Sequence, residues 1–186
     1  MLTQQIQDYV KLYDNIIDLN LCDSTVASLS PDKFEPHYYF NAITQERTQN
    51  EFDLEMSWND IPQRQAVTSA LFPAIDRYLT DIKSECFKGW QGYTPIRFNK
   101  YHENKKMTLH CDHIQDLFGE GPNGIPILSI VGELNDDYTG GEFIMWDTVI
   151  KIPKGSVLIF PSVFLYPHKV DPVITGTRYS YVSWVF

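Results

Sequence analysis

The sequence is poor in the features that mark secreted and membrane-spanning proteins. It has only three cysteines, Cys22, Cys86 and Cys111, which is an odd number and shows no zinc-ligand spacing, so we expect a reduced, cytoplasmic protein. The N-terminus lacks a basic segment followed by an apolar run, so no signal peptide is predicted. The longest apolar run, around Val157–Leu165, is interrupted by Pro161 and is too short to span a membrane.

Positive charge is also scarce, which argues against a nucleic-acid partner. The 186 residues include 15 Lys and Arg against 24 Asp and Glu, giving a formal net charge of -9. Nucleic-acid-binding domains usually carry a basic surface that neutralises phosphates. The chain is instead 43% hydrophobic and 14% aromatic, so we expect a packed globule, and its length predicts a single domain.

The hydrophobic pattern changes near Gly92. Before it, residues 19–29 and about 62–84 have the 3–4 residue spacing of helices, although Pro73 should kink or interrupt the second. After it, short segments alternate with a period of two and are separated by Gly, Pro, Asn and Asp clusters. We therefore predict one α+β domain over residues 1–186. A helix-rich leader, about 1–90, would back a double-stranded β-helix (jelly roll) of mainly antiparallel strands, about 91–186.

Between these parts, residues 31–59 are polar, aromatic and irregular in pattern. Polar segments with exposed aromatic side chains often line binding clefts, but an ordinary surface hairpin would have the same composition. The sequence leaves both interpretations open.

Three side chains have the chemistry of a mononuclear metal site. His110 and Asp112 stand two residues apart, and His168 follows far downstream. Residues i and i+2 of a strand point to the same side, so His110 and Asp112 could converge if both lie in a strand. Two imidazoles and one carboxylate form the triad that holds non-haem Fe(II) with open coordination positions. The residues alone also allow a surface His–Asp contact and an unrelated histidine. Arg178, ten residues after His168, suits the binding of a co-substrate carboxylate.

The C-terminal half resembles the Fe(II)/2-oxoglutarate oxygenases, specifically their prolyl 4-hydroxylase-like branch. The resemblance rests on several motifs in order: Tyr101 nine residues before His110-Cys111-Asp112; Leu134-Asn135-Asp136-Asp137-Tyr138 followed by Gly140-Gly141-Glu142-Phe143; Pro153-Lys154-Gly155-Ser156-Val157-Leu158-Ile159-Phe160; His168-Lys169-Val170; and Gly176-Thr177-Arg178-Tyr179-Ser180, with Trp184 close behind.

The resemblance implies roles for individual residues. His110, Asp112 and His168 would ligate Fe(II), and Arg178 would bind the distal carboxylate of 2-oxoglutarate. Replacing Arg178 by Ala should then weaken 2-oxoglutarate binding tenfold or more, and the sequence suggests that the fold would survive.

Three further residues would serve the co-substrate or the substrate. Tyr101 would add a hydrogen bond to 2-oxoglutarate, and Ser180 would assist from the strand face that it shares with Arg178. Trp184 would line the substrate cleft.

The activity that this resemblance implies is that of a 2-oxoglutarate-dependent dioxygenase. With Fe(II) as cofactor and 2-oxoglutarate and O2 as co-substrates, it would hydroxylate prolyl residues in a peptide or protein and release succinate and CO2. Two alternatives remain: a hydroxylase of a free amino acid or other small molecule, and a non-catalytic metal-binding jelly-roll module. No nucleic-acid or membrane partner is expected.

Overall fold

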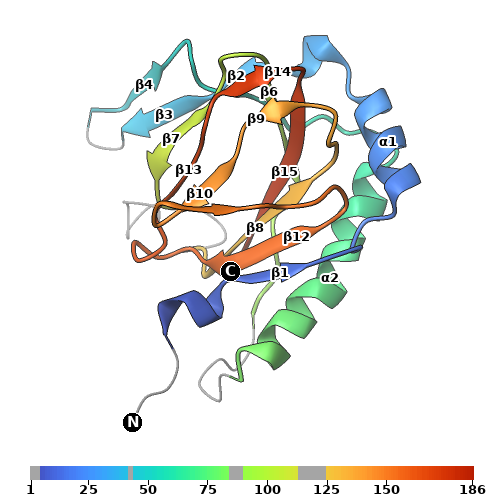
Figure 1. Ribbon diagram of the computed structural model, residues 1–186, viewed down its shortest axis with the longest axis vertical. Helices are drawn as coiled ribbons and strands as arrows, with labels where there is room; N and C mark the ends of the chain where they lie inside the picture. The colour runs from blue at the N-terminus through green and yellow to red at the C-terminus, as the bar shows by residue number, and fades with distance from the viewer. Residues whose placement is uncertain (1–4, 42–43, 84–89, 113–124) are drawn as a thin grey trace.

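The structure, a computed structural model, describes residues 5–41, 44–83, 90–112 and 125–186 (Figure 1). Cys86 lies outside the described residues. In the described part, the strands form two main sheets and two small ones, and every pairing between named strands is antiparallel.

The larger sheet has seven strands. In spatial order they are β1 (Lys11–Tyr13), β12 (Val157–Pro161), β8 (Leu128–Glu133), β15 (Arg178–Val185), β6 (Arg97–Tyr101), β5 (Glu55–Ser57) and β2 (Glu35–Pro36). The smaller main sheet consists of β11 (Thr148–Ile150), β10 (Phe143–Met145), β13 (His168–Val170) and β7 (Met107–His110). Two-stranded ladders join β14 (Val173–Thr175) to β9 (Thr139–Gly140), and β3 (Tyr38–Asn41) to β4 (Glu46–Gln49).

Strand alternation divides the interior into two hydrophobic cores. In β12, Leu158 and Phe160 belong to the core between the two main sheets, whereas Val157 and Ile159 belong to the core between the larger sheet and the helices. Phe143 of the smaller sheet packs against Phe160 of the larger, with ring centroids 6.1 Å apart. The two sheets therefore face each other across a packed layer, which is the jelly roll that the strand pattern predicted.

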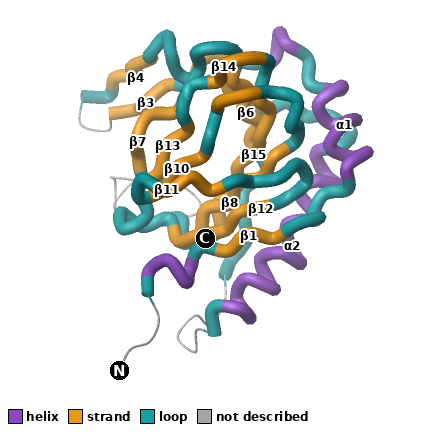
Figure 2. The backbone as a smooth tube through the Cα atoms, viewed as in Figure 1, coloured by secondary structure: helices purple, strands orange, loops and turns teal. Residues whose placement is uncertain are grey.

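Two α-helices lie on the same side of the molecule, against the larger sheet (Figure 2). They are α1 (Leu19–Ser28) and α2 (Arg64–Asp81), and the short 3-10 helices span Ile6–Tyr9 and Pro31–Lys33. Pro73 lies inside α2, but the helix continues through it, so the predicted interruption is wrong. Burial of the face that contains Leu71, Ile75 and Tyr78 stabilises the helix beyond the one hydrogen bond that proline removes.

Residues 31–59 are more regular than the sequence suggested. They contain β2, the β3–β4 hairpin and β5, and β5 extends the larger sheet next to β6. The hairpin is the surface hairpin that the composition allowed, and β4 is exposed along its length.

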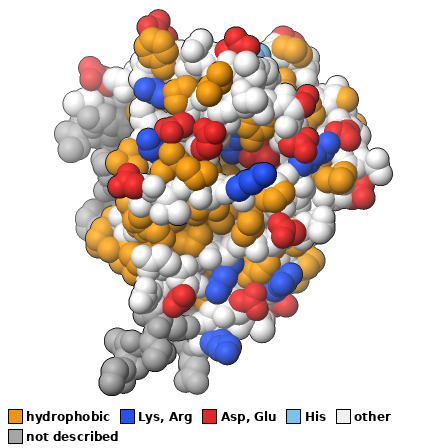
Figure 3. Space-filling view, in the orientation of Figure 1, with side chains coloured by type: hydrophobic (Ala, Val, Ile, Leu, Met, Phe, Trp, Pro, Cys, Tyr) orange, Lys and Arg blue, Asp and Glu red, His pale blue; other side chains and the backbone are white. Residues whose placement is uncertain are grey.

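The surface chemistry agrees with the composition. On the face shown in Figure 3, Lys and Arg side chains are interspersed with Asp and Glu. No helix in the described part of the chain is both long and apolar enough to cross a membrane.

Candidate active site

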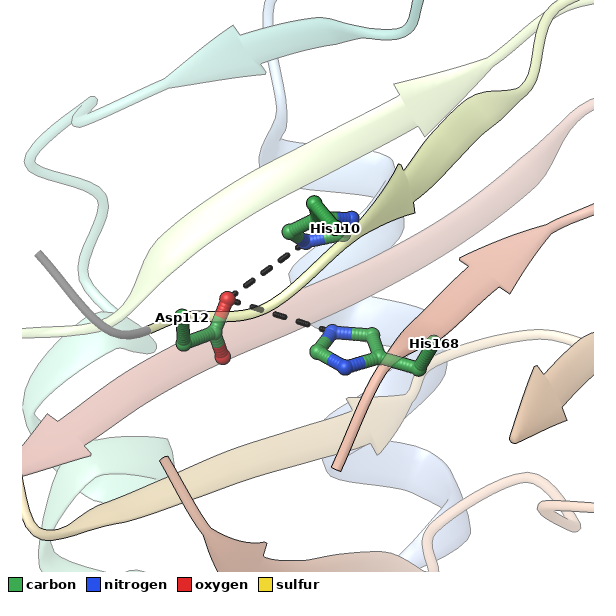
Figure 4. Close-up of side chains that lie close together, drawn as sticks. All are labelled: His110, Asp112 and His168. Carbon is green, nitrogen blue, oxygen red and sulfur yellow. Dashed lines mark ion pairs between the residues drawn. The ribbon is translucent and has the colours of Figure 1, made fainter. Parts of the chain in front are cut away.

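The structure brings His110, Asp112 and His168 together. His110 ends β7 and lies directly opposite His168 of β13, so antiparallel pairing places the two imidazoles side by side, with ring centroids 4.3 Å apart. Asp112 Oδ1 is 3.4 Å from His110 Nε2 and 3.8 Å from His168 Nε2 (Figure 4). One ligand atom from each residue lies within 4.8 Å of the other two.

The route by which Asp112 reaches this cluster differs from the expectation. The spacing argument places His110 and Asp112 in one strand, but β7 ends at His110 and Asp112 lies in a bend beyond it. The pairing between β7 and β13 is also irregular between His168 and Val170. The carboxylate is therefore positioned by the turn of the chain after the strand, and strand alternation is not the cause.

Backbone carbonyls orient both histidines. His110 Nδ1 lies 2.8 Å from the carbonyl oxygen of Thr108, and His168 Nδ1 lies 3.0 Å from that of Tyr166. Because a carbonyl oxygen can only accept, each Nδ1–H donates, and each Nε2 is left facing Asp112. Hydrogen bonds of this kind hold metal-ligating histidines in a single tautomer and orientation.

The protonation states suit cation binding. Burial alone would raise the pKa of Asp112, but hydrogen bonding with His110 and the charges of both histidines hold it well below its usual range. Burial lowers the pKa of His168, which favours the neutral ligand form. Cis ligands bound about 2.1 Å from a metal lie about 3 Å apart. A small inward shift of these atoms would therefore close the triad on a divalent ion.

The wall around His168 is aromatic. The ring of Phe143 is stacked on the His168 imidazole at a centroid distance of 5.2 Å, and the Phe160 ring meets it edge-on at 5.0 Å. His168 is 5% exposed, whereas the His110 side chain is 24% exposed and that of Asp112 13%. The cluster is thus closed on the His168 side and accessible on the side of β7.

Arg178 lies deep between the sheets, beside Tyr101. The two residues are direct neighbours on β15 and β6, and the Arg178 guanidinium lies 4.8 Å from the centre of the Tyr101 ring. Arg178 is paired with an unexpected carboxylate, because its Nε and Nη2 donate to Glu133 Oε2 at 3.1 and 2.7 Å. Both side chains of this pair are almost completely buried, at 1% and 2% exposure.

The other two predicted residues share the inward face of β15 with Arg178. Ser180 is 1% exposed, and its hydroxyl has no hydrogen-bond partner within the described structure. Trp184 is half-buried near the other end of the strand, opposite Ser129 of β8. The Ser129 hydroxyl contributes to the low pKa of Asp112, so Trp184 lies on the metal-cluster side of the barrel.

Sequence reasoning missed two charged residues of the interior. Glu133 stands in the apolar strand 127–134, where a lone carboxylate is itself a signal, because burying a charge requires a partner. Arg97 faces inward from β6, with its guanidinium 5.2 Å from the centre of the Trp184 ring. Its Nε donates to Asn99 Oδ1 at 3.1 Å, and no carboxylate of the described residues forms an ion pair with it.

The fold and the cluster together define a class. A jelly roll that holds two histidines and one aspartate between its sheets has the ligand set of a mononuclear non-haem iron protein. The sequence model of the 2OG-Fe(II) oxygenase superfamily matches residues 96–186, just under half of the chain. The resemblance predicted from the motifs is confirmed.

Curated relatives support the assignment. A PKHD-type hydroxylase of Xylella fastidiosa (strain M12) is 37% identical over 102 residues, covering 49% of this chain and 44% of the relative. A PKHD-type hydroxylase of Acinetobacter baumannii is 33% identical over 98 residues, covering 49% of this chain and 42% of the relative. The matched region thus spans less than half of each relative.

Solved structures match the fold over nearly the whole chain. The viral collagen prolyl hydroxylase of Paramecium bursaria Chlorella virus-1 gives a TM-score of 0.67 at 17% identity, covering 95% of this chain and 94% of that structure. A Pseudomonas putida prolyl-4-hydroxylase also gives 0.67, at 19% identity and 95% and 91% coverage. The predicted jelly-roll fold class is confirmed. The match to this superfamily implies Fe(II) as the metal and 2-oxoglutarate and O2 as co-substrates, and the donor set described above fits Fe(II).

Proposed function

We propose that this chain is an Fe(II)- and 2-oxoglutarate-dependent dioxygenase that hydroxylates prolyl residues in a peptide or protein, releasing succinate and CO2. The observation that carries the proposal is the convergence of two carbonyl-oriented histidines and one aspartate in a member of this superfamily. The fold shared with prolyl hydroxylases supports the choice of substrate class. One such structure, from Trichoplax adhaerens, contains a peptide fragment of hypoxia inducible factor, with a TM-score of 0.66, 18% identity and 96% and 84% coverage.

In this proposal His110, Asp112 and His168 hold the metal. A facial triad leaves coordination positions for a bidentate 2-oxo acid and for O2. When bound, Fe(II) and 2-oxoglutarate supply the oxidising chemistry that hydroxylates a C–H bond, and the protein orients the substrate and excludes water.

The co-substrate would bind on the inward face of β15 and β6. Arg178 and Tyr101 would bind the distal carboxylate of 2-oxoglutarate, and the unpartnered hydroxyl of Ser180 would assist. The aromatic contacts of Phe143 and Phe160 with His168 would exclude water from that side of the metal.

The β3–β4 hairpin favours a peptide substrate over a small molecule. Tyr39 shares a hydrogen bond with Thr108 at 2.6 Å, which ties the hairpin to β7 two residues before His110. An exposed hairpin anchored beside the accessible side of the triad can serve as one wall of a peptide groove. On the opposite sheet, Arg97 and Trp184 would contact the substrate.

We also propose that residues 1–186 act as one domain in a reducing, cytoplasmic setting. The first point is supported by the core shared between α1, α2 and the larger sheet. The second is supported by Cys22 and Cys111, which are free thiols in the described structure.

Anaerobic titration of the apo protein with Fe(II) and 2-oxoglutarate tests this proposal. We expect a visible metal-to-ligand charge-transfer band that disappears in His168→Ala and persists in His102→Ala, a matched control because His102 is an exposed histidine. Succinate release on proline-rich peptides, compared with free proline, then separates the two substrate classes. A protein that binds metal but gives neither a band nor succinate would instead be the non-catalytic module.

A further inference from the structure

The co-substrate arginine is already neutralised by an internal carboxylate. Glu133 Oε2 accepts hydrogen bonds from both Nε and Nη2 of Arg178, so one edge of the guanidinium is fully occupied. This pair is formed by neighbouring strands, because β8 and β15 are hydrogen-bonded and Glu133 is opposite Ser180. An arginine intended for an external dicarboxylate is therefore held by a carboxylate of the chain itself.

The pair nevertheless retains free binding capacity. Arg178 Nη1 and Glu133 Oε1 are both buried and have no hydrogen-bond partner in the described structure. Both residues line a cavity of about 670 Å³, together with Tyr138, Gly141 and Phe143. Phe143 stacks on His168, so the cavity extends toward the triad, although no triad residue lines it. Each residue of the pair thus keeps one buried polar atom without a hydrogen-bond partner, in the region where a carboxylate of 2-oxoglutarate is expected.

Charge balance limits what can enter. If Glu133 stayed ionised, a second carboxylate would place two negative charges against one guanidinium in a buried site, which is strongly unfavourable. The other titratable groups that face Glu133 are Tyr138 from the loop after β8, Tyr101 from β6 and Tyr181 from β15. Burial raises the pKa of all three tyrosines, so they are neutral near pH 7 and supply no positive charge. The cavity is also lined by two lysines and two acids, Lys151, Lys154, Asp136 and Glu142, which balance one another in number and add no net positive charge.

We propose that 2-oxoglutarate binds together with one proton, which Glu133 takes up, so that the neutral acid donates a hydrogen bond to the distal carboxylate and Arg178 Nη1 donates another. This inference rests on the proposed function and explains how a site with one buried carboxylate accepts the 2-oxoglutarate dianion. Burial raises the pKa of Glu133 to about 7, with Arg178 opposing the shift, so the proton is available near neutral pH.

The sign of the pH dependence follows. Below about pH 7 Glu133 already carries the proton, so 2-oxoglutarate affinity should be nearly independent of pH. Above it, each pH unit should weaken binding about tenfold, because one proton must be taken from solvent.

Isothermal titration calorimetry of the full chain loaded with Mn(II), a redox-stable stand-in for Fe(II), tests the proposal. 2-Oxoglutarate is titrated at pH 6.0 and 8.5 in buffers of low and high ionisation enthalpy. We expect uptake of about one proton at the higher pH and little at the lower. Glu133→Gln, a neutral isostere, should bind at the higher pH at least as tightly as wild type, without proton uptake. Asp76→Asn removes an exposed carboxylate of α2 that does not line the cavity and should keep the wild-type pH dependence.

The outcomes separate this inference from the function on which it depends. Wild-type binding without proton uptake at the higher pH, or a folded Glu133→Gln that has lost 2-oxoglutarate binding, would overturn the role of Glu133 and leave the dioxygenase proposal standing. Absence of 2-oxoglutarate binding at both pH values in wild type and Glu133→Gln, with Mn(II) bound, would overturn the proposed function and this inference with it.

Discussion

The two charged regions of the barrel interior are built in opposite ways. At the triad, Asp112 and His110 keep partial access to solvent, and the described residues around the cluster hold the two imidazoles through backbone carbonyls. At the other region, Arg178 and Glu133 are buried almost completely and satisfy one another. The first region offers ligand atoms to an external cation, whereas the second has its charge balanced by a carboxylate of the chain itself.

This difference indicates how each region gains specificity. The triad is accessible, and its ligand atoms are oriented before a metal binds. It therefore discriminates between divalent ions by their size and preferred coordination geometry. A closed, neutral ion pair selects by charge, because an incoming carboxylate must bring or find a compensating proton. Substitutions at the triad should therefore impair metal binding, whereas substitutions at the Arg178–Glu133 pair should impair stability and 2-oxoglutarate binding.

The largest effect is expected at the metal cluster. Asp112→Ala removes the only carboxylate of the triad and should lower Mn(II) or Fe(II) affinity at least roughly 100-fold, measured by calorimetry. Asp171→Ala is the matched control, since Asp171 is half-exposed and pairs with Lys169. Wild-type metal affinity in Asp112→Ala would show that these three residues are not the ligand set.

Substitution of Arg178 should lower the stability of the fold as well as 2-oxoglutarate binding. Arg178→Ala leaves Glu133 buried without its partner, which should lower the free energy of unfolding by about 3–5 kcal/mol, measured by urea denaturation. This replaces the sequence-based expectation that Arg178→Ala spares the fold. Adding Glu133→Gln removes the stranded charge and should recover part of that loss, while 2-oxoglutarate binding stays at least tenfold weaker. A single mutant as stable as wild type would contradict the importance of the pair.

The smallest effect is expected at the hairpin. Tyr39→Phe removes the hydroxyl that bonds Thr108 and should cost about 1 kcal/mol of stability in denaturant melts, with metal affinity within about threefold of wild type. Tyr38→Phe is the control, because a phenyl ring can still lie under the Arg47 guanidinium. A large loss of metal affinity in Tyr39→Phe would mean that the hairpin positions β7, and the two regions would then be less independent than proposed.

Much of the fold could be predicted from local pattern. The period of two after Gly92 requires half-buried strands, and the buried residues Leu71, Ile75 and Tyr78 recur at the spacing of one helix face. Pro73 does not interrupt α2, because burial of one face of the helix stabilises it by more than the loss of one backbone hydrogen bond destabilises it. The hairpin at β3–β4 was left open because composition alone does not distinguish a loop from an exposed strand pair.

The sequence alone determined the chemistry that is available: two histidines and an aspartate for a metal, an arginine for a carboxylate, and a net negative charge. Which groups meet was decided by tertiary structure. His168 reaches His110 only through the pairing of β13 with β7, and Glu133 reaches Arg178 only through the pairing of β8 with β15. The physical reason is that strand register joins residues about 45 to 58 positions apart, and neither spacing nor composition encodes that register locally.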